Sequence, residues 1–94
     1  MDNRFDISQF VDTPTESGIT TALVERVRLR RKEAKLTQRA LAVKSGVSYS
    51  SIRRFESTGD ISLSSLIKIA DALDCLTDFN NLFKNRKITS IKDL

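Results

Sequence analysis

The stretch that decides the fold is LTQRALAVKSGVSYSSIRRFE, residues 36–56, which predicts two short helices joined by a tight turn. Thr37 is a suitable N-cap for the first helix, because its hydroxyl can accept a hydrogen bond from an exposed backbone amide. Gly46 favours the left-handed conformation just past a helix end, and Val47 can pack into the angle between the helices. The residues expected to face inward on the first helix are Ala40, Leu41 and Val43.

The second helix of the pair is expected to begin after Ser48, another N-cap residue. Ile52 and Phe55, three residues apart, would form its buried edge. Its other side carries hydroxyl and guanidinium groups and no carboxylate: Tyr49, Ser50, Ser51, Arg53 and Arg54. Such groups can contact the edges of bases, so this face is typical of a surface that binds DNA.

The composition is that of one small domain. Of the 94 residues, 39% are hydrophobic, and no apolar run approaches the roughly 20 residues needed to cross a membrane. The opening residues MDNRFDISQF lack the apolar region of a signal peptide, so we expect a cytoplasmic protein with no membrane association. A single cysteine, Cys75, excludes an internal disulfide and is expected to be buried and inert. Without histidine the usual zinc ligand sets cannot form, and we expect neither a metal nor a cofactor.

Positive charge is concentrated around the predicted helix pair. The chain has a net charge of +4, but residues 22–54 alone carry ten basic and two acidic groups. Residues 1–21 sum to −3 and residues 55–94 to −1. A run of charge by itself is usually a solvated face. Its coincidence with the helix pair favours a partner that carries phosphates.

A longer helix is expected upstream, from about residues 18–21 to residue 35. One stripe of this helix comprises Val24, Val27, Arg31 and Ala34, while Arg26, Arg28, Arg30 and Lys32 are expected on its outward faces. Arg31 therefore lies on the apolar side, where an unpaired charge would cost several kcal/mol or more. We expect a carboxylate partner for Arg31, and Glu56 at the end of the helix pair is the candidate.

Two more helices are predicted after the pair. Gly59 marks the end of the preceding helix, and Ser62 is the expected N-cap of the next. That next helix should run from residue 63 to about residue 73 and close the core with Leu63, Leu66, Ile67, Ile69, Ala70 and Leu73. Thr77 is the expected cap of a last short helix, which contains Phe79, Leu82 and Phe83. These three side chains either complete the core or form the contact surface of a homodimer or another partner.

The two ends of the chain lack a sustained helical period. Residues 1–17 are an expected N-terminal arm, whose apolar side chains could form a short strand, dock on a partner or belong to a mobile tail: Phe5, Ile7, Phe10 and Val11. Residues 85–94 are an expected C-terminal tail that could order on a partner, add a β-segment across a dimer or fray, with apolar residues at Ile88, Ile91 and Leu94. The predicted domain therefore spans residues 18–84.

These features together resemble the helix-turn-helix of the Cro and lambda-repressor family, also called the XRE family. The resemblance covers about residues 19–83 and rests on Leu36-Thr37-Gln38, Leu41-Ala42, Gly46-Val47-Ser48, Ile52 and Glu56, with Leu63, Leu66, Ile69, Ala70 and Leu73 in the following helix. It implies an all-α fold, a compact five-helix lambda-repressor-like DNA-binding domain with flexible or short-strand terminal extensions. It also implies a homodimer that binds a palindromic operator in double-stranded DNA.

The resemblance assigns roles to individual residues. Tyr49, Ser50 and Arg54 match the positions that reach base edges in the major groove, with Ser51 and Arg53 next in line. Gln38 would bond a phosphate and brace the recognition helix. Further contacts to the DNA backbone are expected from Arg39, Ser48, Ser57 and Thr58. The family also pairs an arginine of the first helix with the glutamate that ends the recognition helix, which again points to Arg31 and Glu56.

Two positions depart from the family pattern. Ala40 stands where members commonly have glutamate, so the reciprocal capping box at Thr37 is missing. The turn FESTGDISLSSL, residues 55–66, replaces a longer basic loop, so fewer contacts to the DNA backbone are expected there. With ALDCLTDFNNLF, residues 72–83, this turn is similar to small regulators encoded beside HipA-like kinase toxins. That similarity implies a HipB-like antitoxin with a HipA-like kinase as partner.

Three classes of function compete. The first is a homodimeric, sequence-specific repressor that binds DNA, in the narrower form an antitoxin that regulates its own promoter. The second is an interaction module that sequesters a partner protein with weak or no DNA binding, suggested by the acidic arm and the aromatic last helix. The third is an enzyme, for which only Asp71, Asp74 and Asp78 could gather carboxylates, and a solvated helix face explains them better. The sequence favours the first class and predicts no enzyme, since it has no histidine base and no glycine-rich phosphate loop.

Overall fold

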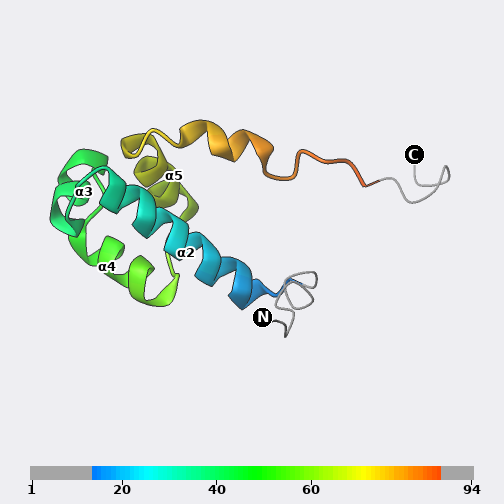
Figure 1. Cartoon of the computed structure of the whole chain (residues 1–94), viewed down its shortest axis with the longest axis horizontal. Coiled ribbons are helices and arrows are strands. Elements are labelled where there is room, and N and C mark those ends of the chain that lie inside the picture. Colours follow the sequence, from blue (N-terminus) through cyan, green and yellow to red (C-terminus); the bar gives the residue numbers. More distant parts are fainter. Residues whose placement is uncertain (1–13, 88–94) are drawn as a thin grey trace, which may run out of the picture.

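A computed structural model describes residues 14–87, and all regular structure in this range is helical. The α-helices are α2 (Glu16–Glu33), α3 (Gln38–Ser45), α4 (Tyr49–Thr58) and α5 (Leu63–Ala72), followed by the 3₁₀ helix η1 (Leu76–Asn81). Helix α3 packs against α4 and α5, while α2 packs against α4 and η1 against α5. Figure 1 shows residues 82–87, which follow η1, running away from this helical body. The predicted all-α class with five helices is confirmed.

The predicted helix caps are present. The side-chain oxygens of Thr37, Ser48 and Ser62 accept hydrogen bonds from the backbone amides three residues later, at 3.0, 3.1 and 3.1 Å. Each such cap stabilises a helix by about 1 kcal/mol. Gly46 and Gly59 end α3 and α4 in the left-handed conformation, with φ angles of 78° and 86°. These caps set the tight turns on either side of α4.

The core lies where α3, α4 and α5 meet. Its largest fully buried side chains are Phe55, Leu41, Ile52 and Ile69, and Val47 is also buried. Val27 of α2 and Leu36 pack against this cluster from the side. Complete burial of a side chain of this size contributes about 1.5–3 kcal/mol. The core thus fixes α4 by its Ile52 and Phe55 edge and leaves its other faces exposed.

Three residues expected in the interior are exposed. Val43 is 86% exposed, because it lies two residues after the buried Leu41 and hence on the opposite side of α3. Leu63 is 65% exposed at the first position of α5, before the turn of that helix that reaches the core. Ala34 is exposed because α2 ends at Glu33 and Ala34 is its C-cap. The apolar stripes predicted for these helices are therefore shorter than expected.

The outer helices also differ from their predicted limits. Helix α2 begins at Glu16, earlier than expected, because Thr15 caps it by accepting a hydrogen bond from the amide of Gly18 at 3.0 Å. Thr77 is not a cap, since η1 has no side-chain cap and begins at Leu76. Because η1 ends at Asn81, the last helix contains Phe79 but neither Leu82 nor Phe83.

Some predictions fall outside residues 14–87. The proposed strand or docking segment of the arm, with Phe5, Ile7, Phe10 and Val11, and the apolar positions Ile88, Ile91 and Leu94 of the tail lie outside the described residues. Within the described range, no helix has the length and apolar character that crossing a membrane requires. In the same range, no group of three or more histidine, cysteine or acidic side chains is placed to hold a metal ion.

Candidate nucleic-acid interface

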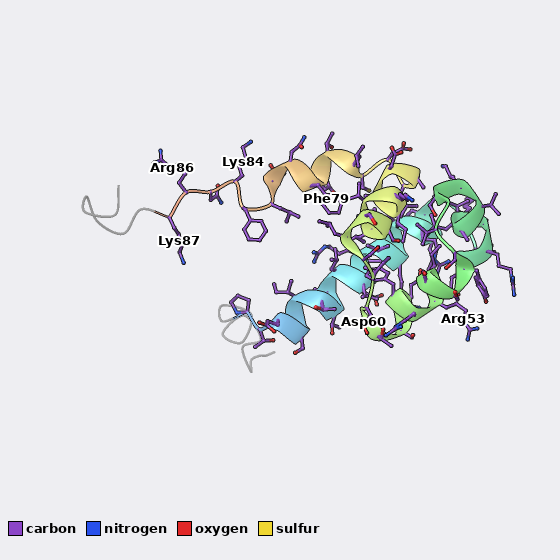
Figure 2. The ribbon with its side chains drawn as sticks, turned by 180° about the vertical axis from the view of Figure 1, so that it is seen from behind. Arg53, Asp60, Phe79, Lys84, Arg86 and Lys87 are labelled. Carbon is purple, nitrogen blue, oxygen red and sulfur yellow. The ribbon has the colours of Figure 1, made fainter. Side chains whose placement is uncertain are left out.

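Helix α4 buries one edge and exposes a polar face. Ile52 and Phe55 are buried, whereas Ser50, Arg53 and Arg54 are exposed. Residues three and four positions apart share one face of a helix, so the hydroxyl and the two guanidinium groups lie on the same side. Figure 2 shows Arg53 projecting from the body of the molecule. The exposed face of α4 therefore carries hydrogen-bond donors that point outward, while the buried edge of the helix is fixed in the core.

A buried ion pair joins α4 to α2. Arg31 donates to Glu56 through Nε to Oε2 at 2.8 Å and through Nη2 to Oε1 at 2.9 Å, the pair expected from the sequence. Arg31 Nη1 also donates to the carbonyl oxygen of Leu36 at 2.9 Å. The side chains of Arg31 and Glu56 are only 10% and 5% exposed, so both charges are removed from water. A bidentate ion pair of this kind fixes the orientation of α2 relative to α4.

Gln38, the first residue of α3, completes this network. Its Nε2 donates to Oε1 of Glu56 at 2.9 Å, so it joins α3 to α4. Burial by itself raises the pKa of the Glu56 carboxyl, but the hydrogen bonds from Arg31 and Gln38 and the positive charges of Arg31 and Arg28 outweigh it. The pKa of Glu56 therefore lies below its usual value. At neutral pH the carboxylate is ionised and holds three helices together.

A hollow of about 580 Å³ lies beside the exposed face of α4. Residues of α2, α3 and α4 line it: Arg28, Arg31, Gln38, Ser50, Arg53, Arg54, Glu56 and Ser57. Four guanidinium groups and one carboxylate give this hollow a net positive charge. A concave surface with fixed cationic donors attracts a ligand that carries phosphates.

Arg28 is the member of this hollow that sequence interpretation missed. The charge pattern alone places Arg28 among the outward-facing groups of the first helix. Its side chain is 38% exposed, and its Nε lies 3.7 Å from Oε1 of Glu56. Arg28 precedes Arg31 by three residues, so the two lie on one face of α2. The predicted pairing of Arg31 with Glu56 is the signal that could have placed Arg28 beside α4.

Comparison with protein families shows to which family this arrangement of helices belongs. The model of the helix-turn-helix family matches residues 27–79, more than half of the chain, and the match contains α3, α4 and α5. The chain belongs to the Cro/C1-type (XRE) helix-turn-helix family. Neither the curated proteins nor the solved structures gave a significant match. Members of this family are DNA-binding transcription regulators. In a helix-turn-helix the second helix is the one called the recognition helix, and α4 is the second helix of the α3–α4 pair.

Tyr49, at the start of the recognition helix, is flanked by two arginines. The guanidinium carbon of Arg39 lies 4.0 Å from the centre of the Tyr49 ring, and that of Arg53 lies 5.6 Å from it. Both distances are in the range of cation–π contacts. Arg39 comes from α3, so this contact links the two helices of the motif on their outer side. The half-buried ring is thereby held at the N-terminal end of α4.

Several hydroxyl groups predicted to bind the DNA backbone already have partners. Ser57 Oγ donates to the carbonyl oxygen of Arg53 at 2.9 Å, and Thr58 Oγ1 donates to that of Arg54 at 2.7 Å. Ser48 Oγ donates to Ser51 Oγ at 2.8 Å. A phosphate oxygen can only accept, so each donating hydroxyl would have to exchange its present partner to bind one.

The predicted contact residues therefore form two groups. The lining of the hollow includes Gln38, Ser50, Arg53, Arg54 and Ser57. Outside that lining are Arg39, Ser48, Tyr49, Ser51 and Thr58. The first group is brought together by the structure, whereas the second is distributed along α3 and the two ends of α4.

A second hollow of about 390 Å³ is apolar and lies between α2, α5 and η1. Its lining includes Ile19, Leu23, Val27, Leu66, Ile69, Phe79 and Leu82. Leu82 is 58% exposed and Phe83 is fully exposed, so these two side chains do not complete the core. Cys75 also lines this hollow, and it is half-buried rather than buried, with its Sγ donating to the carbonyl oxygen of Leu73 at 3.3 Å.

Proposed function

We propose that this chain regulates transcription by sequence-specific binding of α4 in the major groove of double-stranded DNA. One observation carries this proposal: four guanidinium groups converge beside the exposed face of the recognition helix. Duplex DNA carries one phosphate charge per about 1.7 Å of its axis, so a cationic hollow beside a groove-binding helix has phosphates within reach. The buried Arg31–Glu56 pair supports the proposal, because it holds α4 rigid without using its outer donors.

Base reading is assigned to the outer face of α4. Arg54 is the proposed main reader, because a guanidinium can donate two parallel hydrogen bonds to O6 and N7 of guanine, worth about 1–3 kcal/mol of discrimination. Arg53 has the same chemistry one position earlier. Tyr49 can contact a thymine methyl group or a phosphate, and hydroxyl contacts to bases are proposed for Ser50 and Ser51.

Contacts to phosphates would set the position of the domain on the DNA. Gln38 has a suitable donor left, since its Nε2 carries two hydrogens and Glu56 accepts only one. We add Arg28 to this group, because its guanidinium is partly exposed in the hollow. The other proposed backbone contacts are Arg39, Ser48, Ser57 and Thr58.

A homodimeric repressor is the form of regulator that we propose. Phe79, Leu82 and Phe83 are the proposed contact surface, and the full exposure of Phe83 supports it. Two copies related by a two-fold axis would present their recognition helices about 34 Å apart, one turn of DNA. The operator would then be palindromic.

A narrower proposal is a HipB-like antitoxin that also holds a HipA-like kinase toxin. It is supported by the sequence of the turn at residues 55–66 and of the segment at residues 72–83. The second candidate function is an interaction module with weak or no DNA binding, favoured by the apolar hollow beside η1. Co-purification of a larger partner together with no measurable DNA affinity would favour the module over the regulator.

The salt dependence of DNA binding tests the main proposal. Fluorescence anisotropy with a labelled duplex should show affinity falling by orders of magnitude between about 50 and 200 mM salt, because bound phosphates release counterions. Arg28→Ala should make the slope of log K against log salt shallower by about one. Arg26→Ala is the matched control, since Arg26 lies on α2 outside the cationic hollow, and it should leave the slope unchanged. Binding that does not respond to salt would contradict the proposal.

A further inference from the structure

Arg54, the proposed guanine reader, contacts a carboxylate in the structure. Its Nη2 lies 3.3 Å from Oδ2 of Asp60, in the turn between α4 and α5. The two side chains are 70% and 68% exposed, so the pair is open to any ligand that approaches α4. Figure 2 shows Asp60 on the same edge of the molecule as Arg53. The contact therefore belongs to the proposed DNA-facing surface.

The turn holds Asp60 in place. The Asp60 amide donates to Thr58 Oγ1 at 3.1 Å, and that hydroxyl donates to the carbonyl oxygen of Arg54 at 2.7 Å. Gly59 has a φ angle of 86° and approaches α2 so closely that a Cβ there would collide with Cγ2 of Thr20. The backbone of Asp60 is thus set by hydrogen bonds to the end of α4 and by contact with α2.

A single contact with Asp60 leaves Arg54 able to read a base. A guanidinium has five N–H donors, guanine uses two of them, and Asp60 accepts one. Arg54 can therefore bind guanine while it keeps Asp60 as a partner. A phosphate is a poorer partner for the same pair, because the Asp60 carboxylate repels its negative charge, whereas the guanine edge is uncharged.

We propose that Asp60 is a positioning residue that sharpens sequence specificity by directing Arg54 toward a guanine edge and away from phosphates. This inference rests on the proposed function. An exposed ion pair changes an equilibrium by about fivefold at most. A good guanine contact discriminates by about 5- to 150-fold. Asp60 thus increases a preference that Arg54 creates.

The test compares Asp60→Asn with the wild-type protein on two duplexes, one with the selected guanine site and one of unrelated sequence. Loss of a negative charge should raise affinity for the unrelated duplex by about twofold. Affinity for the guanine site should fall by about two- to fivefold, because Arg54 loses its orientation. The two affinities change in opposite directions, whereas a simple charge effect raises both.

Two controls separate positioning from charge. Asp71→Asn removes the same charge from an exposed position on α5 and should leave the ratio of the two affinities unchanged. In an Arg54→Ala background, Asp60→Asn should also leave that ratio unchanged, because the residue that it positions is gone. Circular dichroism and urea unfolding of every variant verify that the fold is retained.

Three results would overturn the inference. The first is an equal rise of both affinities in Asp60→Asn, and the second is a changed ratio that persists in the Arg54→Ala background. In either case the wild-type preference for guanine would remain, and the proposed function would stand without this role for Asp60. The third is wild-type protein that binds neither duplex, which would overturn the proposed function together with the inference.

Discussion

Replacing Glu56 by glutamine should destabilise the domain strongly. The substitution preserves the size of the side chain and removes the negative charge that faces Arg31. Because the Arg31 side chain is only 10% exposed, its guanidinium would remain buried without a counter-charge. Removing one partner of a buried pair costs about 3–5 kcal/mol. That is a large part of the roughly 5–15 kcal/mol by which a typical domain is stable.

The matched control for this substitution is Glu33→Gln. Glu33 pairs with Arg30 at 2.7 Å, as closely as Glu56 pairs with Arg31, but its pair is 45% and 63% exposed. Exposed pairs contribute less than about 1 kcal/mol. If the N···O distance determined how much each ion pair stabilises the fold, the two substitutions would lower the free energy of unfolding equally. Because burial determines it, we expect Glu56→Gln to lower this free energy by several kcal/mol more than Glu33→Gln.

Urea unfolding followed by far-ultraviolet circular dichroism measures both losses. The double variant Arg31→Met/Glu56→Leu removes both charges and should recover much of the stability lost in Glu56→Gln. A loss in Glu56→Gln no larger than that in Glu33→Gln would refute the view that this network fixes α4 to α2.

Three further predictions concern pH, the turns and assembly. The pKa of Glu56 is lowered in the folded protein, so the ionised carboxylate contributes its full stability above the unfolded pKa of about 4.3, and this contribution is lost as the pH falls through the folded pKa. The urea midpoint of Glu56→Gln should therefore fall less steeply with decreasing pH than that of the wild type. Equal slopes for the two proteins would argue against a stabilising role of the Glu56 carboxylate. In thermal unfolding, Gly59→Ala should lower the free energy of unfolding by at least about 1 kcal/mol more than Gly46→Ala does. Both glycines have a positive φ, but only a Cβ at position 59 would collide with Thr20. Equal losses of stability would show that the turn at Gly59 can relax. Phe83→Ser should reduce the dimer fraction in analytical ultracentrifugation with little effect on the fold, because Phe83 is fully exposed within the chain; an unchanged mass would exclude Phe83 from the dimer contact.

Local features of the fold could be predicted from the sequence because they depend on neighbouring residues. Thr37 and Ser48 cap their helices through amides three residues away, and Gly46 needs only its own backbone freedom. The Arg31–Glu56 pair spans 25 positions, yet it was predictable because a charge on an apolar stripe requires a partner.

Features that depend on how helices end and pack could not be predicted in the same way. Leu63 has the spacing of a core residue, but its place at the start of α5 leaves it exposed. Arg28 enters the cationic hollow only because α2 packs against α4. The contact of Arg54 with Asp60 lies in the same turn as the close approach of Gly59 to α2, and no local sequence pattern indicates either feature.

Selection of bound sequences from a random DNA pool, with wild-type protein and Arg54→Ala in parallel, tests most directly whether the exposed face of α4 reads DNA bases. For the wild type we expect an enriched half-site with guanine at a fixed position, repeated about 34 Å away with two-fold symmetry. For Arg54→Ala we expect the rest of the half-site to persist while that guanine preference disappears. Enrichment of no sequence by the wild type would contradict the assignment of α4 as the base-reading helix, and the same guanine preference in both proteins would contradict the role of Arg54 on that helix.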